Sequence, residues 1–303
     1  MTTTEWESVR TLLVSDVHLG SKYSQSAEFL KFLRRFRPDK LYIVGDFIDG
    51  WKFASGWTWN QHCDDVIEHL LQLARRGTEI CYVPGNHDSF LRNKAFRTML
   101  PQELAGIQIQ HDFVHEMHNG WRFLVTHGDS FDFFETKAQW ISKASSCFYD
   151  ACLSLNWWLH RWTMTEQHNP YGVCRMLKHR VKRGIQFISD FEHKLTDYAH
   201  TRGCQGVICG HIHTPDIVYK PGSLVYCNTG DWMENCTGLV EHHDGEIRLI
   251  GRYQDSRTLR LPVRAVESAD GETPLACELE SEPTSPTNAE ADSNQDRLPE
   301  FAA

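Results

Sequence analysis

Side chains that can bind metal ions or transfer protons recur in this sequence, each set directly after a short apolar run. The runs belong to the segments RTLLVSDVHLG, DKLYIVGDFIDG, EICYVPGNHD, WRFLVTHGDS and GVICGHIHTP. The polar residues that end them are Asp16, His18, Asp46, Asn86, His87, His127, His211 and His213. In an extended backbone, residues two positions apart point the same way, so each D-x-H or H-x-H pair can act together. Mixed oxygen and nitrogen ligands suit Mn²⁺, Fe²⁺ or Zn²⁺ rather than Ca²⁺ or a thiolate site.

The set is too large for one tetrahedral ion. Without His87, seven candidate ligands remain, and two ions bridged by one carboxylate fit that number. A single histidine near a strand end is more often a surface residue, and an aspartate at a loop start is more often a cap or turn residue. Five successive loops each carry such a residue, so surface, cap or turn roles do not account for the whole set. We interpret the other histidines as solvated or structural, namely His62, His69, His111, His115, His118, His242 and His243.

The apolar runs predict buried strands, because they are short and rich in Val, Ile, Leu and Tyr. Helix-like stretches separate the first three runs. AEFLKFLRRF places apolar residues up to Phe36 at helical spacing, and VIEHLLQLARRG ends in basic residues before Gly77, which is typical of a helix stop. Alternating strands and helices indicate an α/β fold, in which function lies at the strand ends.

The pattern changes after Asp129. From about residue 131 to residue 203 the sequence predicts a helical insertion, aromatic-rich in its first part and basic in its second. The strand pattern resumes at Gly206 and closes with a hairpin that turns at Asp244-Gly245. We expect one domain over residues 1–265 and a disordered acidic tail over residues 266–303. The net charge of −9 lies in this tail, which holds ten acidic residues and one basic residue, so the domain itself is balanced.

The sequence favours a cytoplasmic location. The first ten residues, MTTTEWESVR, lack the apolar segment of a secretory signal. No apolar run reaches the roughly 18 residues that a membrane-spanning helix needs. Ten cysteines are present and none forms a C-x-x-C pair, so we expect free thiols in a reducing compartment.

The five loops also carry the resemblance to a known family. D-x-H, GDFID, GNHD, THGD and GHIHTP are similar to the five motifs of the calcineurin-like metallophosphoesterase superfamily, in the same order over about residues 11 to 216. Within it, the SDVHLG start, the GDFIDGW loop, the insertion after THGD and the length resemble the bacterial UDP-2,3-diacylglucosamine pyrophosphatases of the lipid A pathway. That branch typically has Arg where this chain has His87.

This resemblance implies a four-layer α-β-β-α sandwich with a helical cap, and it implies two divalent ions, with Mn²⁺ as the first candidate. Asp16, His18, Asp46 and His213 would hold one ion. Asp46, Asn86, His127 and His211 would hold the other, so that Asp46 bridges them. The ions would bind phosphate oxygens and activate a water for attack on phosphorus. His87 would donate a proton or contact the phosphoryl group. Asp88 is a candidate to orient His87, and Asp129 to orient His127, with loop capping as the alternative for both.

The expected reaction is hydrolysis of a phosphoanhydride or phosphodiester. The resemblance favours UDP-2,3-diacylglucosamine, cleaved to UMP and 2,3-diacylglucosamine 1-phosphate. The alternatives are a soluble nucleotide or another phospholipid as substrate and, in a different class, a non-catalytic metal-binding scaffold.

The insertion has two interpretations. As a lid, its Trp157 and Trp158 would line an acyl-chain groove, while Arg175, Lys178 and Arg180 would contact a diphosphate or an anionic membrane at the inner face. As a plain helical subdomain, its aromatics would form a core and its basic face would be solvated. We expect no nucleic-acid partner, because the aromatic residues lie apart from the cations in the sequence.

Overall fold

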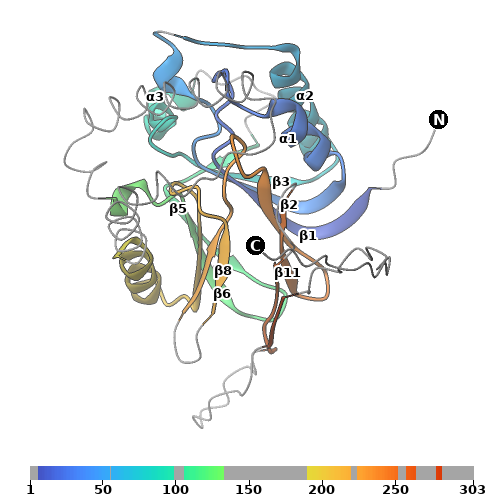
Figure 1. Cartoon of the computed structure of the whole chain (residues 1–303), viewed down its shortest axis with the longest axis vertical. Helices are drawn as coiled ribbons and strands as arrows, with labels where there is room; N and C mark the ends of the chain where they lie inside the picture. Colours follow the sequence, from blue (N-terminus) through green and yellow to red (C-terminus); the bar gives the residue numbers. More distant parts are fainter. Residues whose placement is uncertain are drawn as a thin grey trace, which may run out of the picture.

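The computed structural model describes residues 6–54, 56–98, 106–132, 190–219, 224–251, 257–263 and 278–281. Two β-sheets pack face to face in this part of the chain, with helices on both outer sides (Figure 1). The predicted α/β class is therefore confirmed.

The larger sheet has eight strands in the order β13-β12-β11-β10-β1-β2-β3-β4. Their bounds are β1 (Glu7–Val14), β2 (Phe36–Val44), β3 (Glu79–Val83), β4 (Gln108–Ile109), β10 (Thr237–Glu241), β11 (Glu246–Gly251), β12 (Arg257–Arg260) and β13 (Glu278–Ser281). Strands β1 to β4 run parallel, so their carboxyl ends meet at one edge. Strands β10 and β11 form the predicted hairpin around Asp244-Gly245.

The smaller sheet has five strands in the order β5-β6-β7-β9-β8. Their bounds are β5 (Asp112–Glu116), β6 (Arg122–Thr126), β7 (Gly206–Cys209), β8 (Asp216–Val218) and β9 (Val225–Asn228). Strands β6, β7 and β9 are parallel. The carboxyl ends of β6 and β7 therefore also lie at one edge.

Two helices match the predicted stretches. Helix α1 (Ser26–Leu33) ends earlier than the apolar pattern suggested, because Phe36 already begins β2. Helix α2 (Gln61–Arg75) begins where the Asn60 side chain accepts the Cys63 N–H at 3.2 Å, and it stops before Gly77, which has a φ of +98°. The remaining short elements are α3 (Lys94–Arg97) and the 3₁₀ turns η1 (Gly50–Lys52), η2 (Ser89–Arg92) and η4 (Asp129–Phe131).

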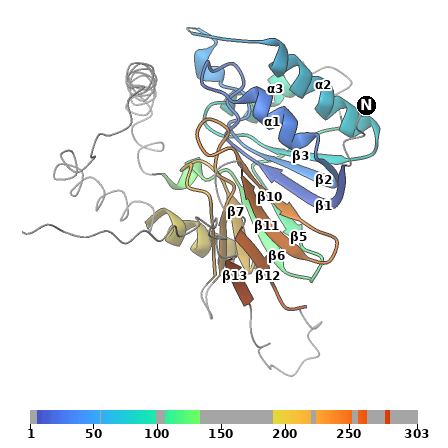
Figure 2. The same ribbon diagram turned by 45° about the vertical axis from the view of Figure 1, so that its right-hand side comes forward.

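Three apolar clusters define four layers. Phe29 of α1 and Val66 of α2 pack on the outer face of the larger sheet, while Leu13 of β1 and Phe123 of β6 belong to the cluster between the two sheets. On the outer face of the smaller sheet, Phe191 contributes to the third cluster from a helix over residues 190–201 (Figure 2). The predicted α-β-β-α sandwich is confirmed.

The insertion and the tail are described only in part. The helix over residues 190–201 lies within the predicted insertion, but the five residues proposed to bind substrate lie outside the described residues, namely Trp157, Trp158, Arg175, Lys178 and Arg180. Within the tail, β13 pairs antiparallel with β12. The prediction of a disordered tail is therefore wrong for Glu278–Ser281, and the other tail residues lie outside the described ranges.

All six cysteines in the described ranges are free and buried, as the sequence predicts for a reducing compartment. Among the described helices, none is both long enough and apolar enough to cross a membrane.

A buried carboxylate joins the two sheets. Glu241 of β10 accepts from the Thr11 hydroxyl at 2.6 Å and from the His118 N–H at 2.8 Å, and one of its oxygens lies 2.8 Å from His115 Nε2. Burial would raise the pKa of Glu241, but the bond to His115, and then the charge of that ring and the Thr11 bond, hold it below the ordinary value of 4.5. The carboxylate therefore stabilises the fold above about pH 4.5, and this contribution is lost as the pH falls through the depressed pKa.

We predict that Glu241→Gln lowers the free energy of unfolding by about 2–4 kcal/mol at pH 7. The deficit should shrink as the pH falls below the ordinary glutamate pKa, because the wild-type carboxyl group then becomes neutral as well. Urea unfolding at a series of pH values measures this. Glu28→Gln is the control, since Glu28 forms an exposed pair with Lys31 and should change stability by less than about 1 kcal/mol. A deficit that is constant with pH would contradict the prediction.

Candidate metal centre

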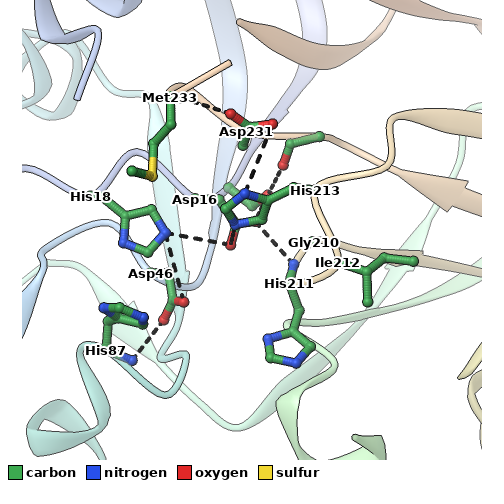
Figure 3. A network of polar contacts seen from close by, with 12 residues as sticks. Asp16, His18, Asp46, His87, Gly210, His211, Ile212, His213, Asp231 and Met233 are labelled. Carbon is green, nitrogen blue, oxygen red and sulfur yellow. Dashed lines mark hydrogen bonds and ion pairs between the residues drawn. The ribbon is translucent and has the colours of Figure 1, made fainter. Parts of the chain in front are cut away.

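The predicted metal ligands, together with His87 and Asp88, follow strands that end at one edge of the sandwich. Strands β1, β2 and β3 of the larger sheet, and β6 and β7 of the smaller one, each stop one to three residues before the first candidate side chain of their loop. The prediction that these five loops follow five strands is confirmed. The two sheets bring the loops together, as Figure 3 shows for the loops after β1, β2, β3 and β7.

The backbone of these loops is strained where the candidate ligands lie. Six non-glycine residues in the described part have positive φ, and five of them are candidate ligands: Asp16 (53°), His18 (51°), Asp46 (50°), His211 (69°) and His213 (50°). The backbone of a non-glycine residue rarely adopts this left-handed region. Each such residue destabilises the fold by the order of 1 kcal/mol or more. Strain concentrated in this way is typical of functional sites, where the geometry of the side chains matters more than local stability.

Two glycines let these loops approach one another. A Cβ at Gly85 would lie 2.2 Å from Asp46 Oδ1 and 2.7 Å from His127 Nε2. A Cβ at Gly210 would lie 2.3 Å from Asp16 Oδ2. The glycines of GNHD and GHIH therefore leave the space that the neighbouring ligands occupy.

The first cluster consists of Asp16, His18 and His213. Each offers one ligand atom, and these atoms lie within 4.8 Å of one another. Asp16 Oδ1 lies 3.2 Å from His213 Nε2 and 4.0 Å from His18 Nε2 (Figure 3). One carboxylate and two imidazoles thus converge on a single point.

The second cluster consists of Asp46, His127 and His211, again with ligand atoms within 4.8 Å. Asp46 Oδ2 lies 3.4 Å from His127 Nε2, and Asn86 Oδ1 lies 3.3 Å from the same nitrogen. Asp46 Oδ2 is also 4.0 Å from His18 Nε2 of the first cluster. This carboxylate therefore lies between the two clusters, where a bridging ligand would be.

Three buried polar atoms at the centre are arranged as ligands of a divalent cation would be. Both ring nitrogens of His18 are buried without a hydrogen-bond partner, and Asp16 Oδ1 is buried with only the 3.2 Å ion-pair contact to His213 Nε2. Such atoms are rare in folded proteins, because each costs free energy unless something satisfies it. Carboxylate and imidazole donors in this arrangement suit divalent transition metals.

The charges of the centre agree with this fit. Burial alone would raise the pKa of Asp46, yet the neighbouring His127 and then His87 hold it well below its usual value. Burial would likewise lower the pKa of His213, but Asp16 raises it to about 9. The carboxylates thus stabilise positive charge at the positions of the imidazole nitrogens. A divalent cation supplies the same charge and competes with these protons.

His87 lies beside these two clusters and forms a third group of possible ligands with His18 and Asp49, whose ligand atoms also lie within 4.8 Å of one another. Its ring is held on two sides. Its Nδ1 is 2.7 Å from Asp49 Oδ1, and since a carboxylate only accepts, Nδ1 donates. The ring of Trp51 stacks on the imidazole at 3.8 Å between centroids, and the His18 ring meets it edge-on at 4.5 Å. Although burial lowers the pKa of His87, Asp46 and then Asp49 raise it above the ordinary histidine value. The imidazole is therefore fixed and favours its protonated form.

Residues 9–215 match the family model of the calcineurin-like phosphoesterases. This chain belongs to that family. It is a metallophosphoesterase, and so a hydrolase. Its family implies divalent metal ions, which the residue groups described above could hold.

Relatives of this phosphoesterase include proteins named UDP-2,3-diacylglucosamine hydrolase. Those from Aeromonas salmonicida and Xanthomonas campestris pv. campestris are 27% and 28% identical; the matches cover 80% and 78% of this chain and 93% and 96% of theirs. One from Azotobacter vinelandii is 35% identical over 40% of this chain, and the match spans 48% of that protein. Among solved structures, vacuolar protein sorting 29 from Cryptosporidium parvum is similar at 13% identity with a TM-score of 0.41, over 90% of this chain and 97% of that one.

The phosphoesterase uses Asp88 differently from the prediction. Its carboxylate accepts the backbone N–H groups of Phe47 at 2.8 Å and Gly85 at 2.6 Å, together with the Tyr82 hydroxyl. It ties the loop after β2 to the loop after β3. Burial and then the charge of Asp46 raise the pKa of Asp88 to about 6. The prediction that Asp88 orients His87 is wrong, because Asp49 makes that contact.

The predicted role of Asp129 is also wrong. His127 Nδ1 donates to the carbonyl oxygen of Val44 at 2.8 Å, which fixes the ring without a carboxylate. Asp129 instead accepts from Arg92 at 2.7 Å. It links the η4 turn to the η2 turn and makes no contact with the imidazole that it was expected to orient.

Three acidic residues of the centre were not among the predicted site residues. Asp49 contacts His87, Asp132 Oδ2 lies 3.1 Å from His211 Nε2, and Asp231 lies behind His213 while accepting from the backbone of Met233 at 2.7 Å (Figure 3). Asp49 is the last residue of the GDFID motif, so a signal for it existed. Asp132 and Asp231 lie outside the motifs, and no spacing in the sequence marks them.

Proposed function

We propose that this phosphoesterase hydrolyses the phosphoanhydride of UDP-2,3-diacylglucosamine to UMP and 2,3-diacylglucosamine 1-phosphate. One observation carries the choice of substrate: two relatives named for it align with this chain over more than nine-tenths of their own length. The reaction class rests on the family and on two ligand clusters that share the carboxylate of Asp46.

We further propose the ligand sets that the family resemblance implies. One ion would be held by Asp16, His18, Asp46 and His213, and the other by Asp46, Asn86, His127 and His211. Mn²⁺ is the first candidate, with Fe²⁺ and Zn²⁺ as alternatives for the same mixed donor set. Two such ions, when bound, neutralise the charge on phosphoryl oxygens and activate the attacking water.

His87 is the proposed proton donor. Because its Nδ1 donates to Asp49, the second ring nitrogen, Nε2, is the one that remains for the substrate. Asp46 and Asp49 favour the protonated ring, in which Nε2 carries a proton that can pass to the leaving-group oxygen. Trp51 prevents the ring from rotating away from this position.

A second substrate class is supported by one residue. His87 stands where the UDP-2,3-diacylglucosamine branch typically has Arg, and this difference favours a soluble nucleotide or another phospholipid as the alternative substrate. The non-catalytic scaffold is disfavoured, because every predicted metal ligand is present at the centre. A lipid-linked substrate would place the enzyme at the inner membrane face, with the residues of the insertion, such as Trp157 and Arg175, as proposed substrate contacts outside the described ranges.

The substrate is tested by a panel with the purified full chain and Mn²⁺. We expect kcat/KM for UDP-2,3-diacylglucosamine to exceed that for bis(4-nitrophenyl) phosphate by about a hundredfold or more, because binding of the acyl chains contributes energy remote from phosphorus. Phosphorus NMR should identify UMP and the sugar 1-phosphate as products. Efficient cleavage of a soluble nucleotide together with no cleavage of the lipid precursor would refute the proposed substrate and leave only the reaction class.

A further inference from the structure

Four exposed aromatic side chains and one half-buried aromatic side chain gather on loops beside the metal centre. We call them the aromatic ridge, and it consists of Phe53, Trp57, Trp59, Phe90 and Phe96. Phe53 and Phe96 are 56% and 49% exposed, and Trp57 and Trp59 are 36% and 37% exposed. These are four of the seven large apolar side chains that are exposed in the described ranges, so the apolar surface is concentrated here. A concentration of this kind marks an interaction surface.

The ridge is continuous. Phe53 contacts Trp57 at 4.7 Å and Phe90 at 5.6 Å between ring centroids. Trp57 stacks on Trp59 at 5.2 Å and 12°, and Phe90 meets Phe96 at 5.9 Å. Two separate segments, the loop from η1 to α2 and the turns η2 and α3, therefore form one surface. Figure 1 shows both segments on the same side of the molecule, with α1 and α2.

The ridge is fixed to the loops that carry candidate ligands. The Trp57 ring lies so close to Gly20 that a Cβ there would be 2.0 Å from it, and the Thr58 N–H donates to the Gly20 carbonyl at 2.8 Å. Gly20 is two residues after His18. On the other side, a Cβ at Gly50 would lie 2.5 Å from the His87 carbonyl oxygen and 2.9 Å from the Phe90 ring. Whatever binds the ridge therefore lies next to the metal centre.

Basic residues predominate in the segments that carry the ridge, although Arg92 is paired with Asp129 at 2.7 Å. Residues 20–23, 50–60 and 89–98 contain five basic residues and no acidic one: Lys22, Lys52, Arg92, Lys94 and Arg97. The side chains of Lys22 and Lys94 are exposed. One acidic side chain contacts the ridge directly: Asp64 of α2 accepts a hydrogen bond from Trp59 Nε1 at 2.8 Å. Aromatic side chains flanked by lysines are complementary to an anionic lipid surface.

We propose that the aromatic ridge inserts into the headgroup layer of an anionic bilayer and holds the metal centre at the membrane surface. Tryptophan and phenylalanine are suited to this boundary because their rings are apolar and the indole N–H remains hydrated. Lysines add attraction to anionic lipids, and apolar insertion combined with basic charge gives reversible attachment. The inference deepens the proposed function and rests on it for its purpose, because a lipid-linked substrate would reach the centre from the bilayer.

The test measures sedimentation of the full metal-loaded chain with vesicles. The wild type should bind phosphatidylglycerol/phosphatidylethanolamine vesicles and bind phosphatidylcholine vesicles more weakly. Phe53→Ser/Phe96→Ser should weaken binding to the anionic vesicles by about tenfold or more. Lys22→Gln/Lys94→Gln should weaken it by about fivefold for each lysine, and added salt should reduce the difference from wild type.

Matched controls lie away from the ridge. Trp6 is 46% exposed at the opposite end of β1 from Asp16, and Trp6→Ser should bind as wild type does. Lys40→Gln is the charge control, because Lys40 pairs with Glu79 at the start of β3, the end of that strand opposite the metal centre. Circular dichroism melting shows whether each variant is folded, and Trp59→Ser serves as a second ridge variant if the double variant is not. Unchanged vesicle binding in a folded ridge variant, or no binding of the wild type to anionic vesicles, overturns the proposal. Because no substrate is used, this result is independent of whether UDP-2,3-diacylglucosamine is cleaved.

Discussion

Asp46→Ala is expected to lower hydrolysis by at least about a hundredfold, the scale seen when a metal site or its support is lost. The reason is the position of the carboxylate. Its Oδ2 is 3.4 Å from His127 Nε2 and 4.0 Å from His18 Nε2, so one substitution removes a candidate ligand from both clusters. Its Oδ1 also accepts a hydrogen bond from the backbone N–H of His87 at 2.8 Å, which holds the loop after β3.

Metal content separates this explanation from general damage. The wild type should hold about two ions per chain, and its melting temperature should rise when Mn²⁺ is added, since an ion that binds the folded chain stabilises it. Asp46→Ala should lose both effects, and Asp46→Asn should lose most of them while keeping the side-chain volume. Asp39→Ala is the control, because Asp39 lies on β2, the strand that precedes Asp46, and its side chain is 70% exposed. Near-normal turnover of Asp46→Ala with full metal content would refute the bridging assignment.

The buried strands and the edge at which their loops meet could be predicted from the sequence, because both depend on local pattern. Short apolar runs ending in polar loops specify buried parallel strands, and the carboxyl ends of such strands meet at one edge. The sequence alone therefore predicts that Asp16, Asp46 and Asn86 lie near one another. Helix boundaries were less certain, since Phe36 fits the helical spacing of α1 but belongs to β2.

Contacts between loops were harder to predict, because neighbours in sequence need not touch. Asp88 is adjacent to His87, yet its carboxylate turns toward the backbone N–H groups of Phe47 and Gly85. Asp49, 38 positions away, makes the contact. The aromatic ridge could not be predicted for a similar reason: Phe53 and Trp57 form one surface with Phe90 and Phe96 only in the folded chain.

The other large expected effect concerns His87. His87→Ala should keep about two ions per chain and lose roughly 10²–10⁴ in kcat, because the ring donates to the leaving-group oxygen or to the phosphoryl oxygens and is not a ligand in the proposed sets. Asp49→Asn should lose less, since the imidazole remains but its orientation and charge are less well supported. His62→Ala, an exposed histidine of α2, should match the wild type. Metal content measured beside kcat distinguishes the roles: loss of metal in proportion to activity would make His87 a ligand.

Leaving-group dependence tests the proton transfer itself. A 4-nitrophenolate leaving group departs readily without a proton, whereas an alkoxide needs one in the transition state. His87→Ala should therefore be far more harmful with an alkyl ester than with a 4-nitrophenyl ester of the same phosphate. Asp49→Asn should show the same trend more weakly, because Asp49 acts through the ring that it orients. If His87 only contacts the phosphoryl oxygens, the loss should be the same for both esters, since the developing charge on phosphorus does not depend on proton delivery to the leaving group.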